Sequence, residues 1–89
     1  MKAIITVIGK DTVGILSKVS TVCAENSANI IEVTQSVLQD LFAMIMLAQV
    51  EESKDNYLNL SKQLETLGKE NNLTIHVMHE DIFNSMHRI

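Results

Sequence analysis

The sequence predicts an α+β sandwich with strands and helices in the order βαββαβ. Short β-branched runs alternate with stretches of helical period, the links between them are short, and 89 residues leave room for one core. Because crossover connections are right-handed, two interleaved βαβ units give an antiparallel sheet in the order 4-1-3-2, with both helices on one face. This is the ferredoxin-like fold class, and we expect a single domain over residues 1–89.

The first strand is predicted at residues 2–8, KAIITVI, which are rich in β-branched side chains and end at Gly9. A turn-forming segment, GKDTVG, follows. Apolar residues then recur with the period of a helix that ends near Asn26 and Ser27. The apolar stripe of this helix consists of Ile15, Val19, Val22 and Cys23.

The next two strands form a predicted hairpin. From Asn29 the pattern has a period of two, which indicates a strand with one face in solvent. Gln39 and Asp40 are the expected turn, and residues 41–51 are apolar on both faces, as in a central strand. In the first of these strands, Ile31, Val33 and Val37 are expected on one face and Glu32, Thr34 and Ser36 on the other.

The second half predicts a helix, a strand and a helical tail. Ser53 is the expected N-cap of the second helix, and Asp81 that of a short helix in the tail, residues 81–89. The tail packs either on its own sheet or on a neighbouring subunit, and its apolar side has Ile82, Phe83, Met86 and Ile89. The second helix buries Tyr57, Leu60, Leu64 and Leu67, and the last strand buries Leu73, Ile75 and Val77.

Composition excludes several classes of function. The net charge is −4 and the 7 basic residues are scattered, so we expect no direct binding to nucleic acid. Cys23 is the only cysteine, which excludes an internal disulfide and fits the reducing cytoplasm. No apolar run approaches the roughly 18 residues that a membrane span needs, so we expect no membrane partner and a cytoplasmic protein.

No constellation of catalytic residues is recognisable. A nucleophile, a base and an orienting group cannot be assigned together, so we expect no enzyme activity and no catalytic residue. His76 and His79 face opposite sides of a strand and cannot hold one ion jointly, and no role is assigned to His87. We therefore expect neither a metal nor a cofactor.

The strongest local feature is the junction between the first strand and the first helix, G9-K-D-T-V-G14. Its helix start offers unpaired backbone N–H groups and a positive partial charge, which suit a carboxylate. Asp11 or Thr12 can cap some of these donors, and Gly14 lets a ligand or another chain approach. The alternative is that Gly9 and Gly14 only permit a tight turn.

Two segments resemble the ACT domain family: ITVIGKDTVGILSKV from Ile5, and SANIIEV from Ser27. The likeness is greatest to the ACT modules of glycine-cleavage-system repressors and their small stand-alone relatives. The resemblance implies a regulatory module that binds a small molecule, an amino acid, between the subunits of a homo-oligomer. Position by position, it implies contacts from Gly9, Lys10, Asp11, Thr12, Val13, Gly14, Asn29 and Ile30.

The sequence departs from this family pattern in two ways. Many members have Pro where Val13 stands, and serine-binding members have His and Asn where this chain has Gly9 and Asp11. From chemistry alone, Asn29 serves either a ligand or a turn, and Asp11 either a ligand ammonium or the helix cap. A module that regulates a protein partner without a small ligand is the second hypothesis. In either case we expect a homodimer, since the core is small.

Overall fold

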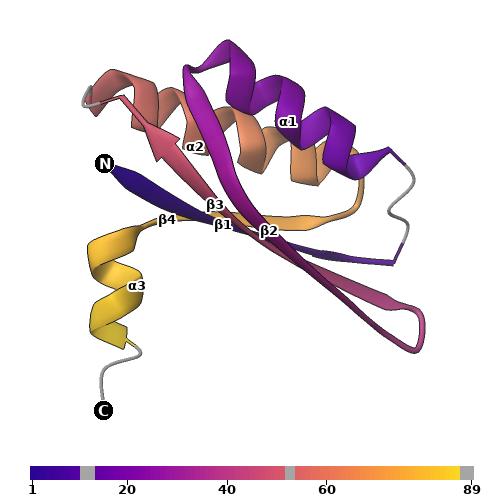
Figure 1. Cartoon of the computed structure of the whole chain (residues 1–89). Coiled ribbons are helices and arrows are strands. Elements are labelled where there is room, and N and C mark those ends of the chain that lie inside the picture. The colour runs from indigo at the N-terminus through magenta and orange to yellow at the C-terminus, as the bar shows by residue number, and fades with distance from the viewer. Residues whose placement is uncertain (11–13, 52–53, 87–89) are drawn as a thin grey trace.

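The computed structural model describes residues 1–10, 14–51 and 54–86. The elements in chain order are β1 (Lys2–Gly9), α1 (Ile15–Glu25), β2 (Ala28–Leu38), β3 (Leu41–Val50), α2 (Lys54–Glu70), β4 (Thr74–His79) and α3 (Glu80–Met86). The strands form one antiparallel sheet in the order β2-β3-β1-β4, with α1 and α2 over one face (Figure 1). The predicted fold class and strand order are confirmed.

The two most apolar strands, β1 and β3, lie at the centre of the sheet. They pair from Lys2 opposite Gln49 to Gly9 opposite Phe42. Side chains alternate along each strand, so one set faces the helices and is buried, while the other set forms the outer face. The largest fully buried side chains are Ile5, Val7, Val19, Cys23, Met44, Met46, Val50, Leu60 and Leu64.

Both helices bury the predicted stripes. Ile15, Val19 and Cys23 of α1 are buried. Leu60 and Leu64 of α2 are fully buried, and each contributes about 1.5 to 3 kcal/mol by leaving water. Val22, Tyr57 and Leu67 pack at the margin of the same core, and the predicted cap Ser53 lies outside the described residues.

The prediction of one buried and one solvent-facing side for β2 is wrong over most of its length. A bulge between Ile30 and Glu32 leaves Ile31 out of the alternation. Val33 and Val37 lie opposite the buried Met46 and Phe42, yet they are exposed themselves, Val37 by 68%. The reason is that the hairpin of β2 and β3 extends past the helices, which cover only the start of β2 (Figure 1).

The hairpin turn is the predicted one. Leu38 pairs with Leu41, which leaves Gln39 and Asp40 as a two-residue loop. Gln39 has φ 57°, the left-handed conformation that tight hairpins need at their first turn position. A polar residue thus takes the place of glycine.

The tail helix α3 folds back on its own chain. It contacts β1 and β4 on the face of the sheet opposite α1 and α2 (Figure 1). The prediction that Asp81 caps this helix is wrong: the helix begins at Glu80, and the Nδ1 atom of His79 accepts the Asp81 backbone N–H at 3.0 Å. The His79 ring also meets the edge of Tyr57, with ring centres 6.4 Å apart.

Candidate functional site

The predicted loop connects the end of β1 to the start of α1. Of its residues, the structure describes Gly9, Lys10 and Gly14, whereas Asp11, Thr12 and Val13 lie outside the described residues. Gly9 is the last residue of β1 and lies against Leu73, because a Cβ atom at Gly9 would lie 2.0 Å from Cδ2 of Leu73. Glycine at this position therefore lets Leu73 pack against the end of β1.

Gly14 occupies the N-cap position of α1 in a left-handed conformation, with φ 73° and ψ 5°. It has no side chain with which to cap the helix, and its carbonyl accepts the first helical bond, from the Lys18 N–H, at 3.1 Å. No acidic residue lies in the first turn of α1. The start of the helix thus offers backbone donors and a positive partial charge without a side-chain carboxylate from its own first turn.

The space next to Gly14 is open. A Cβ atom at this position would meet nothing within 4 Å among the described atoms, and the residue is exposed. Glycine is therefore required here by the backbone conformation, whereas close packing within the chain does not require it. A ligand or a second chain can approach the first turn of α1 at this point.

Lys10 reaches from the end of β1 towards the β2–β3 hairpin. Its Nζ atom lies 3.7 Å from Oδ2 of Asp40, and both side chains are largely exposed. Exposed pairs of this kind contribute little, about 0 to 1 kcal/mol. The ammonium group is therefore held near the loop but can exchange its partner for another carboxylate at small cost.

Asn29 and Ile30 lie at the opposite end of the sheet. Asn29 pairs with Gln49, which pairs with Lys2, whereas Gly9 pairs with Phe42. The two ends of β1 are therefore about 24 Å apart, at about 3.4 Å per residue. Within one chain, the structure does not bring the two parts of the predicted site together.

Asn29 and Ile30 also face different sides of the sheet. Ile30 pairs with the buried Ala48 and packs at the margin of the core, so its side chain lies on the helix side. Asn29 is exposed on the outer side. Because β2 is an edge strand, the Asn29 amide is free to reach around that edge.

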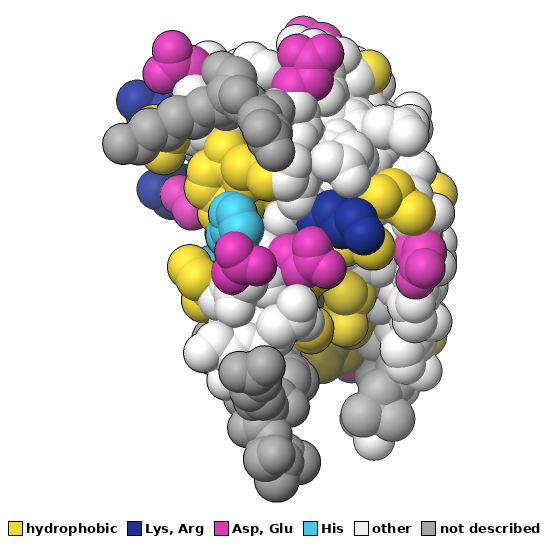
Figure 2. Space-filling view, turned by 60° about the vertical axis from the view of Figure 1, so that its left-hand side comes forward, with side chains coloured by type: hydrophobic (Ala, Val, Ile, Leu, Met, Phe, Trp, Pro, Cys, Tyr) yellow, Lys and Arg dark blue, Asp and Glu magenta, His cyan; other side chains and the backbone are white. Residues whose placement is uncertain are grey.

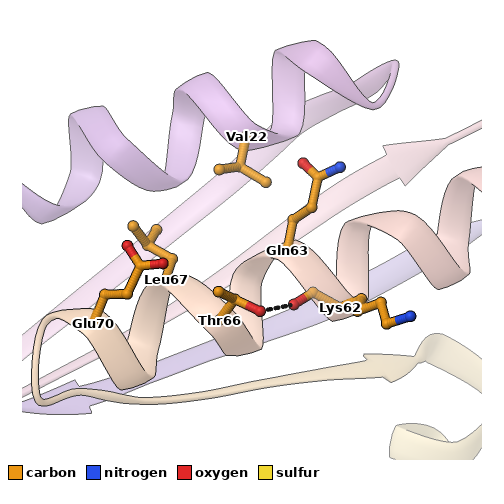
Figure 3. Close-up of a pocket in the computed structure, with 6 residues that line it drawn as sticks. All are labelled: Val22, Lys62, Gln63, Thr66, Leu67 and Glu70. Atoms are coloured by element: carbon orange, nitrogen blue, oxygen red, sulfur yellow. Dashed lines mark hydrogen bonds between the residues drawn. The ribbon is translucent and has the colours of Figure 1, made fainter.

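A hollow that the sequence did not predict lies between α1 and α2. It has a volume of about 390 Å³ and is lined by Val22, Lys62, Gln63, Thr66, Leu67 and Glu70 (Figure 3). At each of its ends, a hydrogen bond joins one helix to the residue that follows the other helix. Lys18 Nζ donates to Asn71 Oδ1 at 2.9 Å, and Asn26 Nδ2 donates to Gln63 Oε1 at 3.0 Å.

The polar groups of this hollow are already engaged or point into solvent. The Thr66 hydroxyl donates to the Lys62 carbonyl at 2.9 Å, and the Gln63 carbonyl oxygen accepts from Asn26. Figure 3 shows the Lys62 ammonium directed away from Val22 and Leu67. Since its polar groups do not converge on one point, the hollow is a weaker candidate than the loop.

Burial affects two of the titratable side chains in the described part. Cys23 is buried, and burial raises the pKa of its thiol from 9.0 to about 11, which suppresses the nucleophilic thiolate. Burial also raises the pKa of Tyr57, whose hydroxyl donates to the Val77 carbonyl at 3.5 Å.

Over residues 1–10, 14–51 and 54–86, no group of three His, Cys, Asp or Glu side chains is placed to hold a metal ion. No helix in these ranges is long and apolar enough to span a membrane.

Comparisons with known proteins agree with this architecture. The profile of the ACT domain family matches residues 2–78. A UPF0237 protein of Methanocaldococcus jannaschii is 44% identical over 88 residues, which are 99% of this chain and 98% of that protein. The solved structure of an ACT domain protein from Streptococcus pneumoniae has a TM-score of 0.81 and 38% identity, and the match covers 93% of each chain.

A more distant structure supports the fold alone. It carries the name of a glycine cleavage system transcriptional repressor, and it matches with a TM-score of 0.75 at 24% identity. The match covers 89% of this chain and 47% of that one. This agrees with the resemblance that the sequence segments from Ile5 and Ser27 indicate.

Proposed function

Because the chain belongs to the ACT domain family, whose members are regulatory ligand-binding modules, we propose that it is a non-catalytic sensor of an amino acid. The ligand lies in a site shared by two subunits. One observation carries this proposal: the first turn of α1 begins at a left-handed, exposed Gly14 with open space beside it.

The chemistry of this place suits the carboxylate of an amino acid. Backbone N–H groups at the start of a helix bind anions, and the helix dipole favours negative charge there. Lys10 adds a cation whose partner, Asp40, is exposed and readily replaced. A ligand carboxylate can thus gain charge-assisted hydrogen bonds that the described residues leave open.

A second subunit supplies the other half of the site. The outer edge of β2 carries backbone groups that pair with no strand of the described chain. Antiparallel pairing of β2 with its copy about a two-fold axis reverses the order of the residues. The partner's Asn29 and the partner's Ile30 then lie beside the end of the sheet that holds Gly9 and Gly14. The Asn29 amide offers donors and an acceptor for the ligand's charged groups.

Calorimetric titration with a panel of amino acids, glycine and serine included, tests this proposal. We expect saturable heat with one amino acid or a small group of them. Gly14→Val should abolish the heat, since a branched side chain would fill the open space and strain the backbone. Lys62→Ala, in the hollow between α1 and α2, is the matched control and should bind as the wild-type chain does. No heat with any amino acid contradicts the proposal.

A second candidate function is the regulation of a protein partner without a small ligand. The exposed part of the hairpin favours it, because Val33 and Val37 lie on the helix side without a covering element. A cytoplasmic protein could cover these side chains by adding a strand to the edge of β2. Retained binding of such a partner by Gly14→Val, together with no response to amino acids, would favour this function.

A further inference from the structure

The tail helix α3 covers part of the outer face of the sheet. It lies against β1 and β4, and its Phe83 lines a cleft of about 170 Å³ together with Ile4, Ile45 and Leu47. Figure 2 shows hydrophobic side chains in this hollow between α3 and the hairpin. Ile82 of the same helix is 55% exposed, so α3 buries only part of its own apolar surface.

The stability of α3 depends on its first turn. The helix has seven residues, and isolated helices shorter than about 12 residues are marginal in water. His79, the residue before the helix, caps it, because its Nδ1 atom accepts the Asp81 backbone N–H at 3.0 Å. This bond requires a neutral ring with its proton on Nε2, since a nitrogen that carries a proton cannot accept a hydrogen bond.

The His79 ring is held in place but remains accessible to water. It packs against the edge of the Tyr57 ring of α2, with the ring planes at 62°. The Tyr57 hydroxyl donates to the Val77 carbonyl at 3.5 Å and is also hydrogen-bonded to the His79 backbone. The His79 side chain is 33% exposed, so protons can reach its ring.

The groups around the ring do not replace the cap once the ring is charged. From α3, Oδ2 of Asp81 lies 3.7 Å from Nδ1, but the Asp81 side chain is 88% exposed, and exposed ion pairs contribute little. From α2 the ring faces Tyr57, and the residue opposite on β1 is the uncharged Ala3. Other charged groups in the segments that meet at this end of the sheet are the Met1 ammonium, Lys2, Glu51, Asp55 and Glu80. A proton on His79 removes the cap and places a positive charge at the start of a helix, where the helix dipole disfavours it.

We propose that His79 is a pH-sensitive latch on α3. The neutral ring caps the helix and holds it on the outer face of the sheet. When the ring gains a proton, at the mildly acidic pH where histidine side chains titrate, α3 unwinds and uncovers the cleft at Ile4 and Ile45. The latch involves neither Gly14 nor the edge of β2, so it does not rest on the proposed function.

NMR spectroscopy of the full chain tests the latch. Long-range ¹H–¹⁵N spectra identify the tautomer of each imidazole ring, and at about pH 7.5 the His79 ring should carry its proton on Nε2. Between about pH 7.5 and 5.5 the ¹³Cα shifts of residues 81–86 should lose at least about half of their helical offset, while those of β1 and β3 stay unchanged. A proton on Nδ1 of the neutral ring, or a helix that persists after His79 is protonated, overturns the proposal.

Variants separate His79 from the other titrating groups. His79→Asn keeps a side chain that caps helices but does not titrate, so α3 should stay helical at both pH values. His79→Ala should reduce the helical offset of residues 81–86 already at the higher pH, because it has no cap. His76→Asn and His87→Asn each remove another histidine and are the controls, which should keep the wild-type response. A response of His79→Asn equal to that of the wild-type chain would assign the pH dependence to another group and overturn the proposal.

Discussion

The Leu73 backbone N–H donates to the Gly68 carbonyl at 2.8 Å, which joins the start of the last strand to the last turn of α2. Asn72 between them has φ 56°, so the helix ends in a left-handed residue as in a Schellman motif. A Cβ atom at Gly68 would lie 2.8 Å from the Leu73 carbonyl oxygen. This close approach of helix and strand is possible because Gly68 has no side chain.

Gly68→Ala should destabilise the fold by about 1 to 3 kcal/mol, although alanine is the better helix former. The reason is that the opposing atom belongs to the backbone, so that helix and strand must separate. Urea denaturation measures the change. Lys69→Ala, the exposed neighbour, is the control and should change stability by less than about 0.5 kcal/mol. Equal stability of Gly68→Ala and the wild-type chain would contradict the close approach.

Gly14→Ala should cost about 1 kcal/mol of stability through its left-handed backbone, since the space beside it is open. Asparagine tolerates this conformation better, so Gly14→Asn should cost less than Gly14→Ala. Thermal and urea unfolding of both variants give the order of their stabilities. The reverse order would show that the backbone conformation at this position is not the cause.

Asn26 and Gln63 should be energetically coupled. Asn26 is only 8% exposed, and its side-chain amide donates to the Val22 carbonyl at 2.8 Å and to Gln63 Oε1 at 3.0 Å. Asn26→Ala should cost about 1 to 2 kcal/mol and Gln63→Ala less. A double-mutant cycle should give a coupling of at least about 0.5 kcal/mol. Strict additivity of the two changes would refute the coupling.

The buried thiol of Cys23 should make stability fall at alkaline pH. Folding raises its pKa from 9.0 to about 11 through burial. Below about pH 9 the thiol keeps its proton in both the folded and the unfolded chain. The contribution of its burial to the free energy of unfolding is therefore fully present there. Between the two pKa values the unfolded chain loses the proton first, which favours unfolding by about 2 kcal/mol near pH 10.5.

The comparison of the wild-type chain with Cys23→Ala isolates this effect, because all other groups titrate in both. Urea denaturation at pH 7 and near pH 10.5 should show a loss of stability that is about 2 kcal/mol smaller in the variant. An equal loss of stability in the wild-type chain and in Cys23→Ala would mean that ionisation of the thiol is not the cause.

The core and the strand order could be predicted because burial imposes a period. Strand β3 is apolar on both faces, and it lies between β1 and β2 as that pattern requires. The stripes of α1 and α2 pack as predicted for the same reason. On β2 around Val37, no helix covers the strand. The alternation of apolar and polar side chains there wrongly predicted a buried face.

Other features depend on local geometry that composition does not signal. Gln39 and Asn72 adopt positive φ angles in place of glycine, and His79 takes the place of the predicted cap Asp81. The separation of Asn29 from Gly14 follows only from the register of the sheet. The hollow between α1 and α2, with a hydrogen bond at each end, is not indicated by any period in the sequence.

Mixing two variants that bind no amino acid tests the shared site most directly. Gly14→Val removes the loop half of the site, and Asn29→Ala removes the strand half. Random pairing of an equal mixture makes half of the dimers mixed, and each mixed dimer has one intact site, so calorimetry should recover about one quarter of the wild-type sites. No recovery in a mixture that demonstrably exchanges subunits would contradict a site built from two chains.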